Sequence, residues 1–392
     1  MKQIKTKDFV RDALILSFSF DRFEDDYIKL NFLFTYLLRG GKKYSKEEFI
    51  TKMNNLNILG INKTINEFPS KIVVDLSVTY ISPIYNKTTK LNKINNFIKD
   101  ILINVDINNK KLNNKEFKIV KDNFIKSYEK KLDNPSTVSY ALYNKEINKN
   151  NNKSNLYTNF IALKKLNNKM IYDTYQRFRK ESILNTLFFT GVKTSFKLDL
   201  PFKQEKVKYD LYKNYENINS ITSDEKLEST RIILSYSLEN LSYKEKEVFI
   251  YLFDDILGSS EGRLFKKIRG EKGLTYGVYS YIDGLNNLLI INMETGSKEY
   301  IKITEELKEI MISMKKISKE ELKTAKINAL RRITSYNESL EGLLNNLYSI
   351  YYFDGLSFSK KKVLTKIATR KDIEKIGDKL VFLGTFIRGN LK

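Results

Sequence analysis

The chain of 392 residues contains no histidine and no cysteine, and it has only four prolines and sixteen glycines. The lack of cysteine excludes disulfides and thiolate metal sites, and it favours a reducing cytosol as the compartment. The lack of histidine excludes a Ser-His-Asp triad, and no serine lies in a G-x-S-x-G elbow. The scarcity of proline and glycine favours long regular elements over a turn-rich sandwich.

Long apolar runs are also lacking, since none approaches the roughly 20 residues needed to cross a bilayer. The apolar run Ala13–Phe20 follows Arg11 and Asp12 and precedes Asp21. A signal peptide would need small residues after the run instead of these charges. We therefore interpret the run as a buried strand, and we expect a cytoplasmic protein without a membrane span.

The composition is 41% hydrophobic and 12% aromatic, which is ample for packed interiors, and the length suggests two domains. The net charge of +22 raises the question of nucleic-acid binding. The lysines, however, are spread along the chain and alternate with acids, as in Lys244–Glu247. No segment combines dense arginine and glycine with stacking aromatics. We expect no nucleic-acid partner and keep this function as the least favoured alternative.

An internal repeat organises the chain. Leu14–Phe20 matches Ile232–Leu238 with both serines in register, and the same register places Gly40 on Gly258. It predicts equivalent strands at those positions and equivalent helices at Asn31–Leu38 and Phe249–Ile256. A glycine after each helix is typical of a left-handed C-cap. Further pairs follow at slightly smaller offsets: Ile72–Val78 with Leu288–Thr295, Leu112–Lys121 with Ile317–Lys326, and Leu184–Val192 with Leu380–Gly389.

Strands and helices alternate unevenly within each copy, which favours an α+β fold. We predict two tandem homologous domains, each with a mostly antiparallel sheet and helices packed on one face. The predicted boundaries are 1–202 for the first domain and 231–392 for the second. Residues 203–230 are polar, with little apolar periodicity, and are predicted to be the linker.

Arg269 and Tyr276 are seven residues apart in the segment Glu261–Ile282. This segment resembles the substrate-gripping stretch in the second half of the pitrilysin and mitochondrial processing peptidase family, zinc peptidases with an inverted H-x-x-E-H motif. The resemblance implies that Arg269 and Tyr276 bind the substrate backbone and stabilise the oxyanion formed during hydrolysis. Gly262 and Gly270 depart from the usual pattern.

The first half of the chain resembles the zinc motif of the same family in an eroded form. In Asn31–Gly41, which reads NFLFTYLLRGG, Asn31 stands at the first ligand position and Thr35 at the second. Phe34 stands at the position of the general base. Asparagine and threonine do not replace imidazole as zinc ligands, and phenylalanine cannot accept a proton.

The third ligand, a glutamate in the family, should precede a segment resembling Asp133–Pro135. By that landmark its position is near Lys126 or Ser127, neither of which binds zinc. Every chemical position of the motif is therefore lost, which indicates a pseudoenzyme without a cofactor of its own.

Two other kinds of site are disfavoured. Gly258–Arg263 has neither the lysine nor the spacing of a P-loop. The acidic pairs Asp25–Asp26 and Asp254–Asp255 could suggest a carboxylate metal site, but adjacent helical residues point about 100° apart and seldom share an ion. We interpret the two pairs as a solvated turn and a helix surface.

The resemblance implies that the chain is the non-catalytic subunit of a bacterial heterodimeric peptidase. In such pairs one subunit carries H-x-x-E-H and zinc, the other carries the Arg/Tyr motif, and each forms half of a clamshell. The implied partners are a zinc-bearing subunit of the same family and a short peptide or leader segment. The alternative is a purely structural subunit of the same fold, in which Arg269 and Tyr276 are relics.

Overall fold

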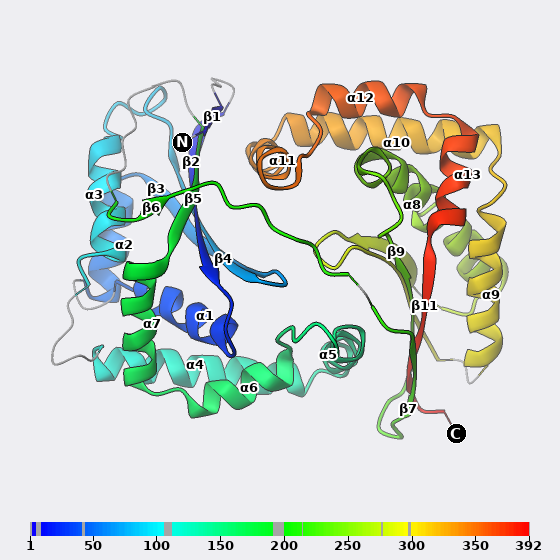
Figure 1. Ribbon diagram of the computed structural model, residues 1–392, viewed down its shortest axis with the longest axis horizontal. Helices are drawn as coiled ribbons and strands as arrows, with labels where there is room; N and C mark the ends of the chain where they lie inside the picture. The colour runs from blue at the N-terminus through cyan, green and yellow to red at the C-terminus, as the bar shows by residue number, and fades with distance from the viewer. Residues whose placement is uncertain are drawn as a thin grey trace. The chain divides into compact units, whose positions relative to one another are not determined.

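The computed structural model describes residues 2–4, 9–40, 44–105, 112–190, 200–213, 215–275, 277–296 and 299–391. The chain forms two compact units, drawn in Figure 1. The first unit comprises Met1–Asn134 and Lys153–Asp210, and the second comprises Pro135–Asn152 and Leu211–Lys392. The segment Pro135–Asn152 therefore lies in the second unit, although the chain on both sides of it belongs to the first.

The sheet of the first unit has the strand order β1-β5-β2-β4-β3, and β6 pairs with β5. The pairs β1/β5 and β5/β6 are parallel. The other pairs are antiparallel, so the sheet is mostly antiparallel. The strands are β1 (Lys2–Ile4), β2 (Arg11–Asp21), β3 (Ile58–Glu67), β4 (Lys71–Ile81), β5 (Ile183–Thr190) and β6 (Lys203–Gln204).

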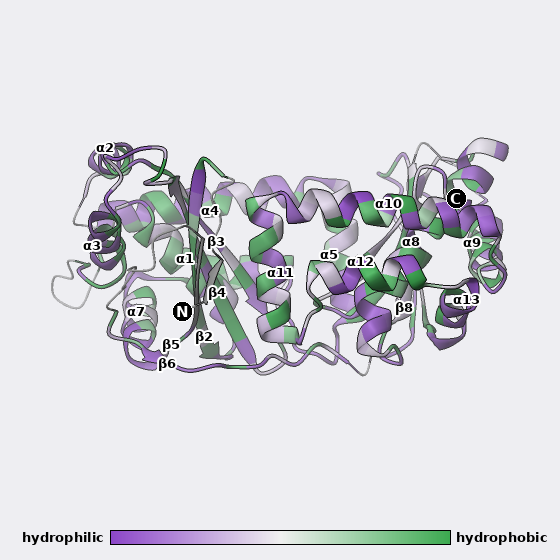
Figure 2. Ribbon diagram, turned by 90° about the horizontal axis from the view of Figure 1, so that it is seen from above, coloured by the Kyte–Doolittle hydropathy of each residue, from purple (hydrophilic) through white to green (hydrophobic). Residues whose placement is uncertain are grey.

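Helices pack on one face of this sheet because alternate residues of β2 are large and apolar. Leu14, Leu16, Phe18 and Phe20 lie in one buried cluster with residues of the helices. Helix α2 is mostly polar, with Phe49 as its buried residue, and it is largely purple in Figure 2. The helices are α1 (Asp26–Leu37), α2 (Lys46–Asn55), α3 (Leu91–Leu102), α4 (Asn114–Leu132), α6 (Leu156–Lys165) and α7 (Asn168–Glu181).

The sheet of the second unit has the order β7-β11-β8-β10-β9, which repeats that of the first unit. Its β7/β11 pair is parallel, as β1/β5 is, and β8 takes the central place of β2. This topology confirms the predicted repeat, including the pairs β4/β10 and β5/β11. The strands are β7 (Ile218–Ser223), β8 (Thr230–Ser237), β9 (Gly277–Asp283), β10 (Leu288–Thr295) and β11 (Val381–Gly389).

In the second unit both faces of the sheet are covered. Ile232 and Leu234 lie in the cluster with the helices that follow in the sequence. Ile233 lies in a second cluster with Tyr143 and Ile147 of α5 (Pro135–Ile147). The other helices are η1 (Glu245–Phe249), α8 (Ile250–Gly258), η2 (Phe265–Glu271), α9 (Tyr300–Ser313), α10 (Lys319–Asn337), α11 (Leu340–Phe353), α12 (Phe358–Ile367) and α13 (Arg370–Lys379).

The long helices α4 and α10 begin within the paired segments Leu112–Lys121 and Ile317–Lys326. The Asn113 side chain accepts hydrogen bonds from the first turn of α4, and Ser318 forms a capping box with Glu321 at the start of α10. Glycine is required at the two repeated positions for different physical reasons. Gly40 has a φ of 98°, whereas Gly258 ends α8 where a Cβ would lie 1.9 Å from Ser280 Oγ. The expected left-handed glycine is thus wrong for Gly258, which is required by close packing.

The compact units differ from the predicted domains in two places. Residues 203–230, predicted as a linker, contain β6 and β7, which pair in parallel with β5 and β11. Residues 135–152 belong to the second unit because α5 packs on its sheet. Among the described residues, no helix is both long enough and apolar enough to cross a membrane.

Candidate functional site

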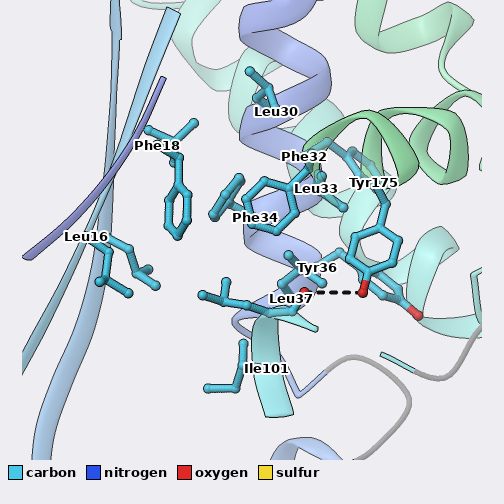
Figure 3. Packing of buried hydrophobic residues seen from close by; sticks show 14 of the residues in the cluster. Leu16, Phe18, Leu30, Phe32, Leu33, Phe34, Tyr36, Leu37, Ile101 and Tyr175 are labelled. Carbon is cyan, nitrogen blue, oxygen red and sulfur yellow. Dashed lines mark hydrogen bonds between the residues drawn. The ribbon is translucent and has the colours of Figure 1, made fainter. Parts of the chain in front are cut away.

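Helix α1 separates the positions of the eroded zinc motif. Asn31 and Thr35 are four residues apart and share one face of the helix. Phe34 lies on another face and is fully buried. Its ring centroid is 5.2 Å from that of Phe178 and 6.1 Å from that of Phe18. Figure 3 shows Phe34 pointing toward Phe18 of β2. The position of the general base has therefore become part of the hydrophobic core.

The third ligand position lies near the first two. A cavity of about 300 Å³ opens between α1 and α4, and Asn31, Thr35 and Ser127 all line it. Lys126, the other candidate, does not line it. The remaining lining residues come from α4 and from the turn after α1: Arg39, Val120, Asn123, Phe124, Tyr128 and Lys131. The structure thus brings together the three positions that would hold a metal in the family.

Lys63 of β3 inserts its ammonium group at these positions. Lys63 Nζ donates to Asn31 Oδ1 at 2.6 Å, and it also contacts the Asn31 carbonyl oxygen and Thr35 Oγ1. It lies 5.8 Å from the centroid of the Phe124 ring. A positive charge of the protein itself therefore lies between the two side chains that replace the zinc-binding imidazoles.

These residues do not fit a zinc ion. Zinc in proteins is held by thiolate, imidazole or carboxylate groups, and an amide and two hydroxyls supply none of these. The nearby ammonium would also repel a metal cation. Across the described ranges, no group of three or more Asp and Glu residues could hold a metal.

The two acidic pairs have structural roles. Asp26 is 3% exposed, forms an ion pair with Arg177 at 2.7 Å and accepts a hydrogen bond from Phe23 N. Asp255 is also buried and forms an ion pair with Arg332 at 2.9 Å. The interpretation of both pairs as solvated residues is therefore wrong for Asp26 and Asp255, because each balances an arginine from another helix.

Burial lowers the pKa of Lys63 to about 7. Since the unfolded chain keeps this proton up to about pH 10.4, the folded state binds fewer protons above pH 7, and stability rises with pH. We expect the stability of wild type relative to Lys63→Met to increase by about 2 kcal/mol from pH 7 to pH 9. Urea unfolding of both proteins at several pH values measures this. A difference that is flat with pH would contradict the prediction.

A local signal in the sequence could have identified Lys63. In β3 the half-buried residues Ile61, Lys63 and Ile65 alternate with the exposed Asn62 and Thr64. A lysine on the apolar face of a strand is unusual, because burying its charge is costly. The companion residues Asn123 and Lys131 carry no such signal, since both lie among polar residues of α4.

Three residues of the second-half motif have structural roles. Arg263 forms a bidentate ion pair with Glu321 at 2.7 and 2.9 Å, and it donates to Ser313 Oγ and to the Lys316 carbonyl. Leu264 and Ile268 are fully buried. These contacts attach η2 to the start of α10 and to the end of α9, so this part of the motif holds the segment in place.

Arg269 is the exception. It lies near the end of η2, is exposed, and forms no ion pair with any residue in the described parts of the chain. The pairing with Glu271 that a purely structural role would favour is therefore lacking. Its guanidinium instead lies 4.8 Å from the centroid of the Phe265 ring. Tyr276 lies outside the described residues.

The second unit has a cavity of its own, of about 360 Å³, bordered by η1, α8, α10, α11 and α12. Its lining includes Glu247 and Lys361, which form an ion pair at 2.8 Å. The lysine of this cavity is therefore balanced by a carboxylate. Within the described ranges Lys63 contacts only neutral acceptors, which distinguishes the cavity of the first unit.

Comparisons with known proteins agree with this geometry. A family model described as the peptidase M16 inactive domain matches residues 181–329. No curated protein matches the chain significantly in sequence.

Solved structures match the whole chain at low sequence identity. A conserved protein from Enterococcus faecalis V583 has a TM-score of 0.87 at 14% identity, over 100% of this chain and 96% of that chain. A peptidase M16 inactive domain from Pseudomonas fluorescens has a TM-score of 0.73 at 13% identity, over 99% and 94%. A protease from Helicobacter pylori has a TM-score of 0.73 at 11% identity, over 99% and 96%. At these identities the structures show the fold.

The sequence motif around Arg269, the repeated α+β topology and the family model all point to one family. Residues 181–329 are thus similar to the inactive domain of the peptidase M16 family, the pitrilysin family of the sequence resemblance.

Proposed function

We propose that the chain is the non-catalytic subunit of a heterodimeric zinc peptidase. In this function a partner of the same family supplies the zinc, its ligands and the general base. This chain supplies Arg269 and Tyr276, which bind the peptide backbone and stabilise the oxyanion. The substrate is a short peptide or a leader segment, held in a chamber that each subunit half encloses.

One observation carries the proposal: Arg269 is exposed and makes no ion pair in the described structure, whereas Arg263, Leu264 and Ile268 of the same motif are held by packing or an ion pair. An exposed guanidinium kept at the end of a helix can donate to a substrate carbonyl or to an oxyanion. The loss of every zinc-motif position in the first unit supports a function in which the chemistry comes from another subunit.

The test is reconstitution. The gene would be co-expressed with an H-x-x-E-H protein of the same family from the same genome, and the pair would be assayed on a library of short peptides. We expect cleavage by the pair that a chelator abolishes, and no cleavage by either chain alone. Activity of the partner that is unchanged by this chain would contradict the proposal.

The structural-subunit alternative gives a different result in the same experiment. A purely structural chain would raise the amount or the stability of the complex, and substitution of Arg269 would leave turnover per complex unchanged. Complex formation and turnover must therefore be measured on the same preparations, by size-exclusion chromatography and by a peptide-cleavage assay.

A further inference from the structure

The cavity between α1 and α4 is lined by basic side chains and by no carboxylate. None of its nine lining residues is acidic, and two of them, Arg39 and Lys131, are basic. Arg39 is only loosely balanced, by Glu116 at 3.5 Å. The Lys131 ammonium lies 5.1 Å from the centroid of the Tyr128 ring and forms no ion pair in the described structure. The cavity is therefore electropositive.

Lys63 adds a third charge behind the lining. Its ammonium is held by Asn31 and Thr35, which both line the cavity, and within the described ranges it has no acidic partner. An ammonium removed from water is costly unless a negative charge is near. The comparable lysine of the second unit, Lys361, forms an ion pair with Glu247, whose negative charge balances the ammonium. The first unit lacks that compensation, and an anionic ligand would supply it.

The lining also offers groups suited to a ligand. Asn123 and Ser127 are exposed and make no side-chain hydrogen bond to other described residues. Val120, Phe124 and Tyr128 form an apolar wall beside them. A cavity of about 300 Å³ is at the lower end of ligand sites, which range over about 300–1,000 Å³. These features suit a small ligand with a charged end and a short apolar or amide portion.

We propose that this cavity, at the place of the family's zinc site, is a binding site for a carboxylate. Lys131 and Arg39 contact the carboxylate, Asn123 and Ser127 hydrogen-bond its oxygens or the adjoining amide, and the protonated form of Lys63 supplies a positive charge from behind. The carboxylate belongs either to a peptide C-terminus or to a free small acid. The proposal concerns the first unit and does not depend on a partner subunit or on Arg269.

The test is calorimetric titration of the full chain with four probes: N-acetyl-glycylglycine, its C-terminal amide, acetate and inorganic phosphate. We expect the peptide acid to bind at least tenfold more tightly than the amide. Acetate binding as tightly as the peptide acid would assign the carboxylate to a free acid. Equal affinity for the acid and the amide, preferential binding of phosphate, or no binding of any probe would overturn the proposal.

Variants place the binding at this cavity. Lys131→Met and Lys63→Met are each expected to weaken binding of the peptide acid about tenfold, which corresponds to about 1.4 kcal/mol. The matched control is Lys130→Met, which removes the same charge from an exposed neighbour outside the cavity. If Lys63→Met does not fold, Lys131→Met and Asn123→Ala still decide the question. Binding that none of these cavity variants changes would also overturn the proposal.

Discussion

Arg269→Ala is expected to lower the turnover of the reconstituted peptidase by about 10²–10³, because loss of one donor to a developing oxyanion has effects of this size. The structural reason is that Arg269 is exposed and makes no ion pair in the described parts of the chain, so its removal costs the fold little. The expected loss is in kcat, since the strongest contact forms in the transition state. Steady-state kinetics at several peptide concentrations measures it.

The control for this variant is Lys267→Ala, which removes an exposed positive charge from the same helix, η2. It should leave kcat within about twofold of wild type, because residues two apart on a helix point to different faces and solvent screens an exposed charge. Tyr276→Phe is expected to lower turnover in the same direction as Arg269→Ala. Normal turnover of Arg269→Ala in an intact complex would rule out the role in oxyanion stabilisation.

Arg263→Ala is expected to destabilise the second unit by about 3 kcal/mol, near the lower end of the cost of breaking a buried ion pair. Arg263 is 15% exposed in its side chain and Glu321 27%, so solvent screens part of the interaction. The substitution also leaves the carbonyl oxygen of Lys316 and the Ser313 side chain without their donor. Denaturant unfolding, followed by tyrosine fluorescence, measures the change.

The matched control is Arg331→Ala, an exposed arginine on α10 without an ion pair in the described structure. It should change stability by no more than about 0.5 kcal/mol. The hydrogen bond from Arg263 lowers the pKa of Glu321 to about 2. A depressed carboxyl pKa stabilises above about pH 4.5, and this contribution fades as the pH falls toward 2. The effect of Arg263→Ala should therefore shrink on acidification, and a constant effect would contradict this assignment.

The fold was largely predictable because the repeat lies in residues that pack. Leu14–Phe20 and Ile232–Leu238 form the central strands of their sheets, where alternation of apolar residues leaves little freedom of register. The placement of α5 was not predictable, because its apolar residues, such as Tyr143 and Ile147, suit either unit equally well. Only contacts with β8, β10 and β11 assign it to the second.

Only some residues of the candidate site could be predicted from the sequence. Alignment with the family motif identified Asn31, Thr35 and the region of Ser127, because helix geometry fixes which positions face each other across α1 and α4. The alignment could not show that Phe34 points into the core or that Lys63 reaches the other two. Lys63 lies on β3, which pairs with β4 in the sheet. Its contact with Asn31 of α1 follows only from the tertiary structure.

The course of the chain through α5 has a consequence for biosynthesis. The sheet of the second unit is completed on one face by a helix that the ribosome makes before the first unit is finished. Tyr143 of that helix forms a buried 2.8 Å hydrogen bond with Ser235, and Arg388 near the end of the chain donates to Ser139 at 2.9 Å. The apolar face of α5 is therefore fully covered only after the last strand, β11, has been synthesised. A gene cut after Asp210 would encode the first unit in full but the second unit without α5.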